Sequence, residues 1–181
     1  MRQDLMIQKI NELYNEYSND LYKYAFFMIN EHEQAKDIVQ ETFIRAYIKL
    51  DSFQGEYVKS WLFRIARNVT IDLIRKNKPI AYFLDLTTPI KSNDKTPEQV
   101  LLMNETEQQL YFAMNKLKRS YRDVIILRKI KEFSISETSH ILGWSENKVK
   151  VTLFRGMQAL KKELEKEGVL RETNWGDESI R

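Results

Sequence analysis

The sequence of 181 residues contains no cysteine and only two histidines, His32 and His140. The missing thiols exclude disulfides, thiolate zinc sites, iron–sulfur clusters and a cysteine nucleophile. Two histidines so far apart in sequence argue against a histidine-based triad and against a multi-histidine metal site. We therefore expect no enzymatic activity, no metal site and no cofactor.

Long apolar runs are also missing. No stretch approaches the roughly 20 apolar residues that a membrane span needs, and the first twenty residues mix charged with apolar side chains, unlike a signal peptide. These absences predict a cytoplasmic protein. The net charge of +3 is too small to indicate a polyanionic partner, so the distribution of charge along the chain carries more information.

Glycine and proline are scarce and unevenly placed. The three prolines all lie between Pro79 and Pro97, and long stretches contain neither residue, which favours helices. No run shows the two-residue alternation of a strand. We predict an all-α chain of two small helical domains joined by a flexible linker, with the second domain containing a helix-turn-helix. The expected boundaries are 1–78 for the first domain, 79–96 for the linker, 97–170 for the second domain and 171–181 for a tail.

Apolar residues at helical spacing predict a first helix over about residues 4–29 and a second helix after Asn30. The second helix has a polar face opposite its apolar one. On pattern alone this face is a solvated surface, although an exposed Ile44 among charged groups hints at a protein contact. The face comprises Asp37, Gln40, Glu41, Ile44 and Arg45.

A loop at 51–59 carries the aromatic residues Phe53 and Tyr57, and a helix over 60–78 begins with Trp61 close behind it. Six cationic residues and one carboxylate between Lys59 and Lys78 give this segment a net charge of +5, more than the whole chain has. Cations beside aromatic rings suit single-stranded nucleic acid, since cations follow phosphates and rings stack on bases. The alternative is that Trp61 belongs to the core and the cations are solvated.

The second domain has the pattern of a helix-turn-helix. We expect a helix over about 97–118, capped by Thr96, and a basic helix over about 120–131. Ser134 and Glu137 then form a capping box, a short helix runs to Leu142, and Gly143 makes the turn into the last helix. An ordinary helical hairpin is the alternative. A helix-turn-helix would place Lys148, Lys150, Thr152 and Arg155 in a major groove.

Three segments in this order resemble a known family. AKDIVQETFIRAY (35–47) closely resembles the core-polymerase-binding helix of bacterial sigma factors. Residues 52–76 resemble their −10-recognising segment, and residues 121–160 resemble their −35-recognising domain. The absence of a middle domain matches the extracytoplasmic-function (ECF) group of alternative sigma factors. The resemblance covers roughly residues 8–165.

The resemblance implies an alternative sigma factor that binds core RNA polymerase at the β′ clamp helices and β flap, recognises −35 and −10 promoter DNA, and promotes melting. It implies no small-molecule substrate and a cognate anti-sigma protein, often membrane-anchored in the family. The implied residues are Asp37, Gln40, Glu41, Ile44 and Arg45 for polymerase; Phe53, Gln54, Tyr57, Trp61, Arg64, Arg67 and Asn68 for the −10 strand; and Lys148, Lys150, Val151, Thr152, Phe154 and Arg155 for the −35 duplex.

The chain departs from the family pattern in the last helix, at Asn147-Lys148, Val151 and Gly156-Met157. We expect Gly156 to weaken that helix by about 1 kcal/mol relative to alanine. Two other functions stay open from the residues alone. One is a stand-alone helix-turn-helix regulator that binds duplex operators. The other is an anti-sigma-like adaptor that binds polymerase without DNA, which the two basic segments argue against.

Overall fold

The computed structural model describes residues 2–55, 57–85 and 104–166. Every regular element in these ranges is helical, which confirms the predicted fold class. In chain order the elements are α1 (Arg2–Ile29), α2 (His32–Lys49), the 3₁₀ turn η1 (Leu50–Ser52), α3 (Val58–Asn77), α4 (Pro79–Phe83), α6 (Glu105–Asn115), α7 (Arg119–Ile125), the π-helical turn η2 (Ile126–Ile130), α8 (Ile135–Leu142) and α9 (Glu146–Lys166).

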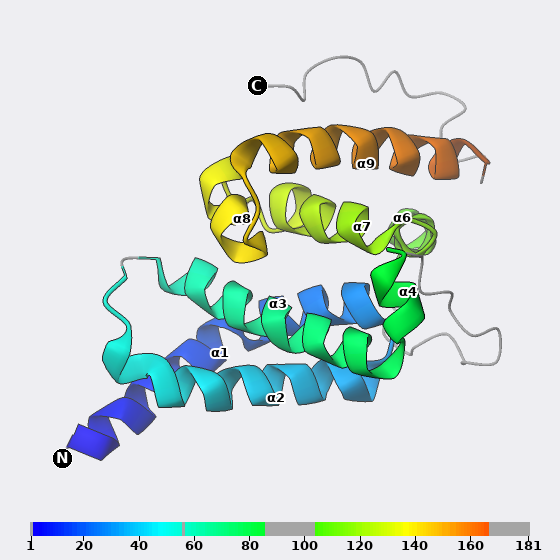
Figure 1. The fold of residues 1–181 in the computed structure, drawn as a ribbon. Helices are drawn as coiled ribbons and strands as arrows, with labels where there is room; N and C mark the ends of the chain where they lie inside the picture. The colour runs from blue at the N-terminus through cyan, green and yellow to red at the C-terminus, as the bar shows by residue number, and fades with distance from the viewer. Residues whose placement is uncertain (1, 56, 86–103, 167–181) are drawn as a thin grey trace.

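Helices α1, α2 and α3 form the first bundle, with α2 on its outer side (Figure 1). Each helix turns its predicted apolar face inward: Leu21 and Tyr24 of α1, Phe43 of α2, and Leu62 and Ala66 of α3 are buried. Residues three or four apart share one side of a helix, so this periodicity is enough to define the core face. The outer faces of α2 and α3 stay free for other contacts.

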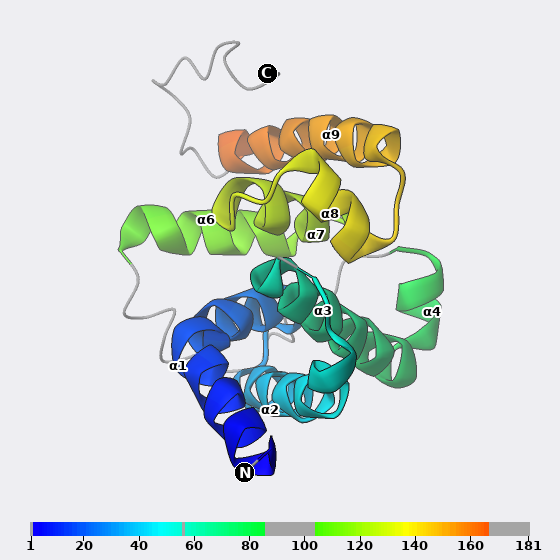
Figure 2. The ribbon, with the colours of Figure 1, turned by 90° about the vertical axis from the view of Figure 1, so that its left-hand side faces the viewer.

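Helices α6 to α9 form the second bundle, in which α9 covers α7 and α8 (Figure 2). The expected helix over 97–118 is interrupted at Asn104, whose backbone is extended, and its residues 97–103 lie outside the described residues. Helix α6 begins at Glu105, because the Asn104 side chain accepts a hydrogen bond from the Glu107 backbone N–H and the Glu107 carboxylate accepts one from the Asn104 backbone N–H. This capping box has the spacing that we assigned to Thr96, which lies outside the described residues.

The helix-turn-helix forms as predicted. Ser134 and Glu137 make the reciprocal capping box at the start of α8. Gly143 ends α8 in the left-handed conformation, with φ at +66°, which a side chain at this position would disfavour. The Ser145 hydroxyl then accepts a hydrogen bond from the Lys148 backbone N–H, at 3.2 Å, and caps the start of α9.

Part of the predicted linker is helical. Pro79 occupies the first turn of α4, where its missing N–H costs no hydrogen bond. After α4, the Asp85 carboxylate accepts hydrogen bonds from the Ser120 backbone N–H, at 3.0 Å, and from the Ser120 hydroxyl. Asp85 therefore supplies the cap that α7 lacks in its own sequence. The rest of the predicted linker lies outside the described residues, and the domain boundaries stay a prediction.

The two bundles pack against each other along a surface that we call the seam, formed by α1 and α3 on one side and by α6, α7 and α8 on the other (Figures 1 and 2). Aromatic rings line it: Phe63 meets Phe133 edge-on at 4.9 Å, and Phe26 stacks on Tyr111 at 5.5 Å. Such pairs add stability beyond the burial of their area. The seam therefore has an apolar centre as well as polar contacts.

Gly156 has a packing role that the sequence did not indicate. It is buried in α9, and a Cβ atom at this position would lie 3.2 Å from both the Ile125 Cδ1 and the Tyr121 Cβ. The missing side chain lets α9 approach α7 closely. The expected loss of helix propensity is thus accompanied by tighter packing between the two helices.

We expect Gly156→Leu to destabilise the second bundle by about 1–3 kcal/mol, because the added side chain must push α9 away from α7. Urea unfolding monitored by circular dichroism measures this change. The matched control is Gln158→Leu, which adds a leucine to the exposed side of the same helix and should change stability by less than about 0.5 kcal/mol. Equal stability of Gly156→Leu and the wild type would contradict the packing role.

Glu137 makes part of the stability dependent on pH. Burial alone raises the pKa of its carboxyl, but hydrogen bonds from Ser134 and Ser60 and the nearby charge of Lys59 lower the pKa below its usual 4.5. A group whose pKa is lowered by folding stabilises the folded state above its unfolded pKa and stops doing so as pH falls. This contribution is therefore complete above about pH 4.5 and lost progressively below it.

We expect Glu137→Gln to have a lower Tm than the wild type at pH 6.5 and a smaller difference at pH 3.5, because the wild-type carboxyl becomes neutral there. Thermal unfolding of both proteins at the two pH values measures this. A Tm difference that stays the same at both values would show that the charge of Glu137 has no part in stability.

Candidate functional site

The polar face of α2 is exposed as the sequence indicates. Ile44 is 54% exposed, and Asp37 and Gln40 also face solvent. Arg45 donates to Glu41 one turn earlier, at 2.6 Å, and lies 3.8 Å from Asp72 of α3. These surface pairs hold side chains in place and contribute little to stability. The five residues predicted to bind polymerase therefore lie together on one accessible helix face.

An apolar groove of about 320 Å³ runs beside this face, between α2 and the first half of α1. Gln40 and Ile44 line it, so two of the predicted contact residues belong to a depression rather than to a flat surface. The sequence did not indicate the contribution of α1. The residues that line the groove are Ile7, Ile10, Asn11, Tyr14, Gln40, Phe43, Ile44, Tyr47 and Ile48.

The loop before α3 holds the predicted aromatic cluster. Phe53 stacks on Trp61 with ring centroids 4.4 Å apart, and Gly55 leaves room for the Phe53 ring, since a Cβ there would lie 2.8 Å from it. Tyr57 is 67% exposed and Gln54 faces solvent. Trp61 is partly buried and packs against the hydrophobic core, so the alternative of a core tryptophan stays open beside a role in binding bases. The loop presents aromatic surface next to the basic helix.

The three polar residues predicted on α3 do not share one environment. Arg64 and Asn68 are exposed. Arg67 lies instead in the seam, where its Nε is 3.3 Å from the Oδ2 of Asp123 in α7; its side chain is 15% exposed and that of Asp123 is fully buried. The Tyr24 hydroxyl donates to the other carboxylate oxygen of Asp123 at 2.9 Å. Both oxygens of this buried carboxylate are thus paired with groups of the first bundle.

The chemistry of this cluster keeps Arg67 charged and Tyr24 neutral. Burial, the largest single cause, lowers the pKa of Arg67, but the charge of Asp123, the hydrogen bond to it and the nearby Tyr24 and Tyr82 together raise the pKa above its usual value. Burial and the same charge raise the pKa of Tyr24 well above its usual value. A buried carboxylate is stable when it is matched by a cation and a donor, which are the two groups present here.

The outer face of α9 carries the residues predicted for the −35 duplex. Phe154 is 52% exposed, and Lys150 and Arg155 are exposed beside it. Val151 is exposed and Thr152 is partly exposed. All six predicted side chains lie on the second helix of the helix-turn-helix, the one that enters the major groove in this motif. The exposed residues are Lys148, Lys150, Val151, Phe154 and Arg155.

Trp144 is a positioning residue that the sequence analysis missed. The Lys148 ammonium lies over its ring, 4.4 Å from the centroid. A cation over an indole face is attracted by the ring's quadrupole, so Trp144 restricts the positions that Lys148 can take at the start of α9.

Several seam contacts join residues that the sequence left unassigned. Lys131 donates to Asp20 at 2.6 Å, and the Ser60 hydroxyl donates to Glu137 at 3.0 Å. Burial, the largest single cause, raises the pKa of Asp20, but the hydrogen bond from Lys131 and the charges of Lys131, Lys59 and Lys23 together lower it below the usual value. The sequence held no signal for these contacts, because the partners are 111 and 77 residues apart.

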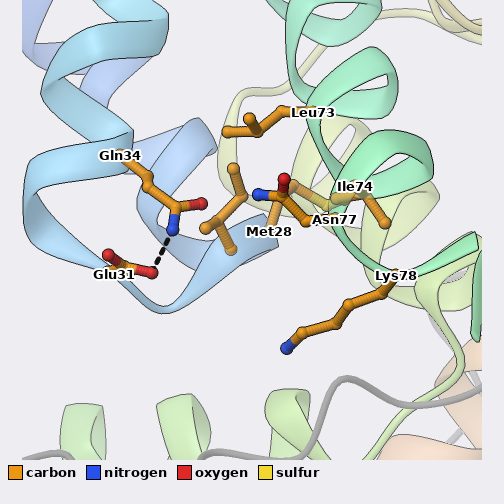
Figure 3. Close-up of a pocket in the computed structure, with 8 residues that line it drawn as sticks. Met28, Glu31, Gln34, Leu73, Ile74, Asn77 and Lys78 are labelled. Carbon is orange, nitrogen blue, oxygen red and sulfur yellow. Dashed lines mark hydrogen bonds between the residues drawn. The ribbon is translucent and has the colours of Figure 1, made fainter.

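A small cavity of about 60 Å³ lies where the α1–α2 turn meets the end of α3 (Figure 3). Figure 3 shows Gln34 donating to Glu31 at its edge and Met28 and Leu73 in its wall. No residue predicted to bind DNA or polymerase lines it. Within the described ranges, no cluster of three histidine, aspartate or glutamate side chains could hold a metal, and no helix has the length and hydropathy to cross a membrane.

Comparison with known proteins agrees with this geometry. The family model for Sigma-70 region 2 matches residues 13–80, and the model for Sigma-70, region 4 matches residues 107–160. The ECF RNA polymerase sigma factor SigX of Bacillus subtilis (strain 168) is 36% identical over 172 residues, which cover 92% of this chain and 87% of SigX. SigM of the same organism is 38% identical over 154 residues, with 84% and 93% covered.

Two solved structures have the same fold. The sigma factor RpoE from Bartonella quintana, in complex with the anti-sigma factor NepR, aligns with a TM-score of 0.72 and 28% identity over 87% of this chain and 98% of RpoE. CnrH, in complex with the cytosolic domain of CnrY, aligns with a TM-score of 0.66 and 23% identity over 91% and 97%. These matches leave no support for a stand-alone regulator or an adaptor. The chain belongs to the ECF sigma factors of the sigma-70 family, non-enzymatic factors that act with RNA polymerase in promoter recognition and transcription initiation.

Proposed function

We propose that this sigma factor divides its task among three surfaces. The α2 face and its groove bind the β′ clamp helices of core polymerase, the Phe53–Trp61 loop and α3 take up the unpaired −10 strand, and α9 reads the −35 duplex. The observation that carries the proposal is the outer face of α9, where exposed Phe154 stands beside Lys150 and Arg155 on the second helix of a helix-turn-helix.

The α2 face suits a partner that binds and leaves in each cycle. Exposed Ile44 lines an apolar groove and would form a small apolar centre that loses its water when the partner binds. The charges of Asp37, Glu41 and Arg45 surround this centre as a polar rim. A small apolar centre within a polar rim is the usual anatomy of a transient interface. Charged rims of this kind set orientation and association rate more than affinity.

The aromatic loop suits unpaired bases. The stacked Phe53 and Trp61 rings and the exposed Tyr57 offer faces on which flipped bases stack, which is worth about 1–3 kcal/mol per base. Arg64, Asn68 and Arg67 would contact the strand and its phosphates. Extruding a base costs a few kcal/mol of unstacking, and such contacts offset that cost.

Helix α9 suits direct readout of duplex DNA. Arg155 or a lysine could donate to the O6 and N7 of a guanine, and Phe154 and Val151 could contact thymine methyl groups. Lys148, whose ammonium lies over the Trp144 ring, and Thr152 would contact the DNA backbone or the edges of neighbouring bases. We further propose that the second bundle contacts the β flap and that the protein acts in the cytoplasm.

We also propose a cognate anti-sigma protein. The sigma factor RpoE from Bartonella quintana, which has the same fold, is bound to the anti-sigma factor NepR in its structure. A membrane-anchored protein with a cytosolic domain would couple release of this chain to an external signal. Purification from native cells under non-denaturing conditions, followed by mass spectrometry, tests this. Repeated recovery of the chain alone from uninduced cells would count against it.

Reconstituted transcription tests the function as a whole. Purified core polymerase and the chain are incubated with fragmented DNA of the source genome, and the 5′ ends of the RNA are mapped. New start sites that share a −35 and a −10 sequence, and that need the chain, are the expected result. Sequence-specific duplex binding without new start sites would overturn the proposal.

We expect Ile44→Asp to weaken binding to core polymerase by at least roughly tenfold, because it places a charge at the centre of the α2 contact. Binding is measured with labelled chain and purified core polymerase, and folding by circular dichroism. Ile80→Asp is the matched control, since Ile80 is also exposed but lies on α4, outside the α2 face. Equal loss in both variants would show that the effect is not specific to α2.

We expect Arg155→Ala to weaken binding to the mapped −35 duplex by about 1–3 kcal/mol and to relax the preference at one base pair. Competition between the −35 duplex and its single-base variants measures both effects. Lys161→Ala removes a cation from the exposed surface of the same helix and should leave the preference unchanged. If Arg155→Ala weakened all duplexes equally, Arg155 would be a phosphate contact and would not read a base.

A further inference from the structure

The seam pairs a predicted −10 contact with a carboxylate of the same chain. The Arg67 Nε faces Asp123 Oδ2 at 3.3 Å, and Asp123 has no exposed surface. A guanidinium in this position cannot turn to a strand phosphate without taking its charge away from the buried carboxylate, which then keeps the hydrogen bond from Tyr24. Loss of a cationic partner from a buried carboxylate is costly, so binding of DNA by Arg67 favours separation of the two bundles.

A second carboxylate of the second bundle lies against the start of the same basic helix. Glu137 of α8 accepts a hydrogen bond from Ser60 of α3 at 3.0 Å, close enough to Lys59 for its charge to act on the carboxyl. The Lys59 ammonium itself lies over the Phe133 ring, 5.2 Å from the centroid. Acidic groups of α7 and α8 thus face α3 at its start and near its middle.

We propose that the free chain rests in a closed state in which Asp123 and Glu137 take the positions of −10 strand phosphates on α3, so that α7 and α8 compete with the promoter strand for that helix. The inference rests on the proposed role of α3. Closure is selective: Arg64 and Asn68 stay exposed, and the outer face of α9 stays free. The closed chain can therefore still bind a −35 duplex.

Further contacts hold the closed state without taking part in DNA binding. Lys131 pairs with Asp20, and Asp85 pairs with Ser120 and lies 3.6 Å from Arg119. Each of these contacts is made at or beside the seam. Opening therefore shifts the population from closed to open molecules, and neither bundle has to unfold. The apparent affinity for the −10 strand is then the intrinsic affinity multiplied by the fraction of open molecules.

The absence of cysteine allows a direct test of the full chain. The double variant Ser60→Cys and Glu137→Cys is joined by a short, reducible thiol crosslinker across the seam. With core polymerase and a promoter from the mapped start sites, we expect the crosslinked chain to lose −10 strand binding and transcription by at least tenfold. Binding to the −35 duplex should change less than twofold, and reduction of the crosslinker should restore all activities.

The outcomes separate closure from promoter function. Ser60→Cys alone, treated with the same reagent, is the control for modification of α3 and should stay active. If the pair does not crosslink in the free chain, or if the crosslinked chain transcribes normally, the closed state is overturned. If the double variant before crosslinking and the wild type both fail to bind the −10 strand, the proposed role of α3 is overturned, and with it this inference.

Two variants with the same change in net charge give an independent measure of how opening of the seam affects affinity for the −10 strand. Asp123→Asn weakens the seam, and we expect free chain to bind a single-stranded −10 oligonucleotide on the order of tenfold more tightly. Asp72→Asn on α3 changes the net charge equally, but Asp72 pairs with Arg75 at the surface. Equal affinities of the two variants would show that charge alone, and not opening, controls binding.

Discussion

The pairing of Arg67 with Asp123 is the constraint on which the arrangement of the two bundles depends. A carboxylate with no exposed surface needs a cation and a further donor, and the first bundle supplies both through Arg67 and Tyr24. This requirement fixes how α7 lies on α1 and α3. The aromatic contacts of Phe63 and Phe26 then fill the rest of the seam. Because Arg67 also belongs to the predicted −10 surface, the contact that orders the seam is one that promoter binding would have to replace.

Much of the fold could be predicted from the sequence, because local signals determined it. Apolar periodicity identified the buried faces, as for Leu21 and Phe43, and the spacing of Ser134, Glu137 and Gly143 identified the helix-turn-helix. These signals act within one or two helical turns, so they can be interpreted without knowledge of the tertiary structure. The roles assigned to individual site residues came instead from the family resemblance, and their positions agree with accessible surfaces on α2 and α9.

The rest could not be predicted, because it depends on long-range contacts. Asp123 counted only as one negative charge in a basic segment, and its partners across the seam are distant in sequence: Tyr24 is 99 residues away and Arg67 is 56. From the sequence, Gly156 is only a residue of low helix propensity. Its packing role depends on the closeness of Ile125 and Tyr121 of α7, which the sequence does not indicate. The start of α6 was not predicted for a different reason. The Asn104–Glu107 capping box is a local signal, but the prediction placed one continuous helix across it; the predicted cap at Thr96 lies outside the described residues.

The placement of the surfaces bears on the order of events at a promoter. Helix α2 lies on the side of the first bundle away from the second bundle (Figures 1 and 2), and its Asp37, Gln40 and Ile44 are exposed in the closed chain. The outer face of α9 is also free in the closed chain, whereas part of α3 is covered. Polymerase docking and −35 recognition can thus precede opening, and only strand capture requires it. If polymerase held the two bundles apart, its binding energy would open the seam, and −10 capture would be confined to the assembled holoenzyme.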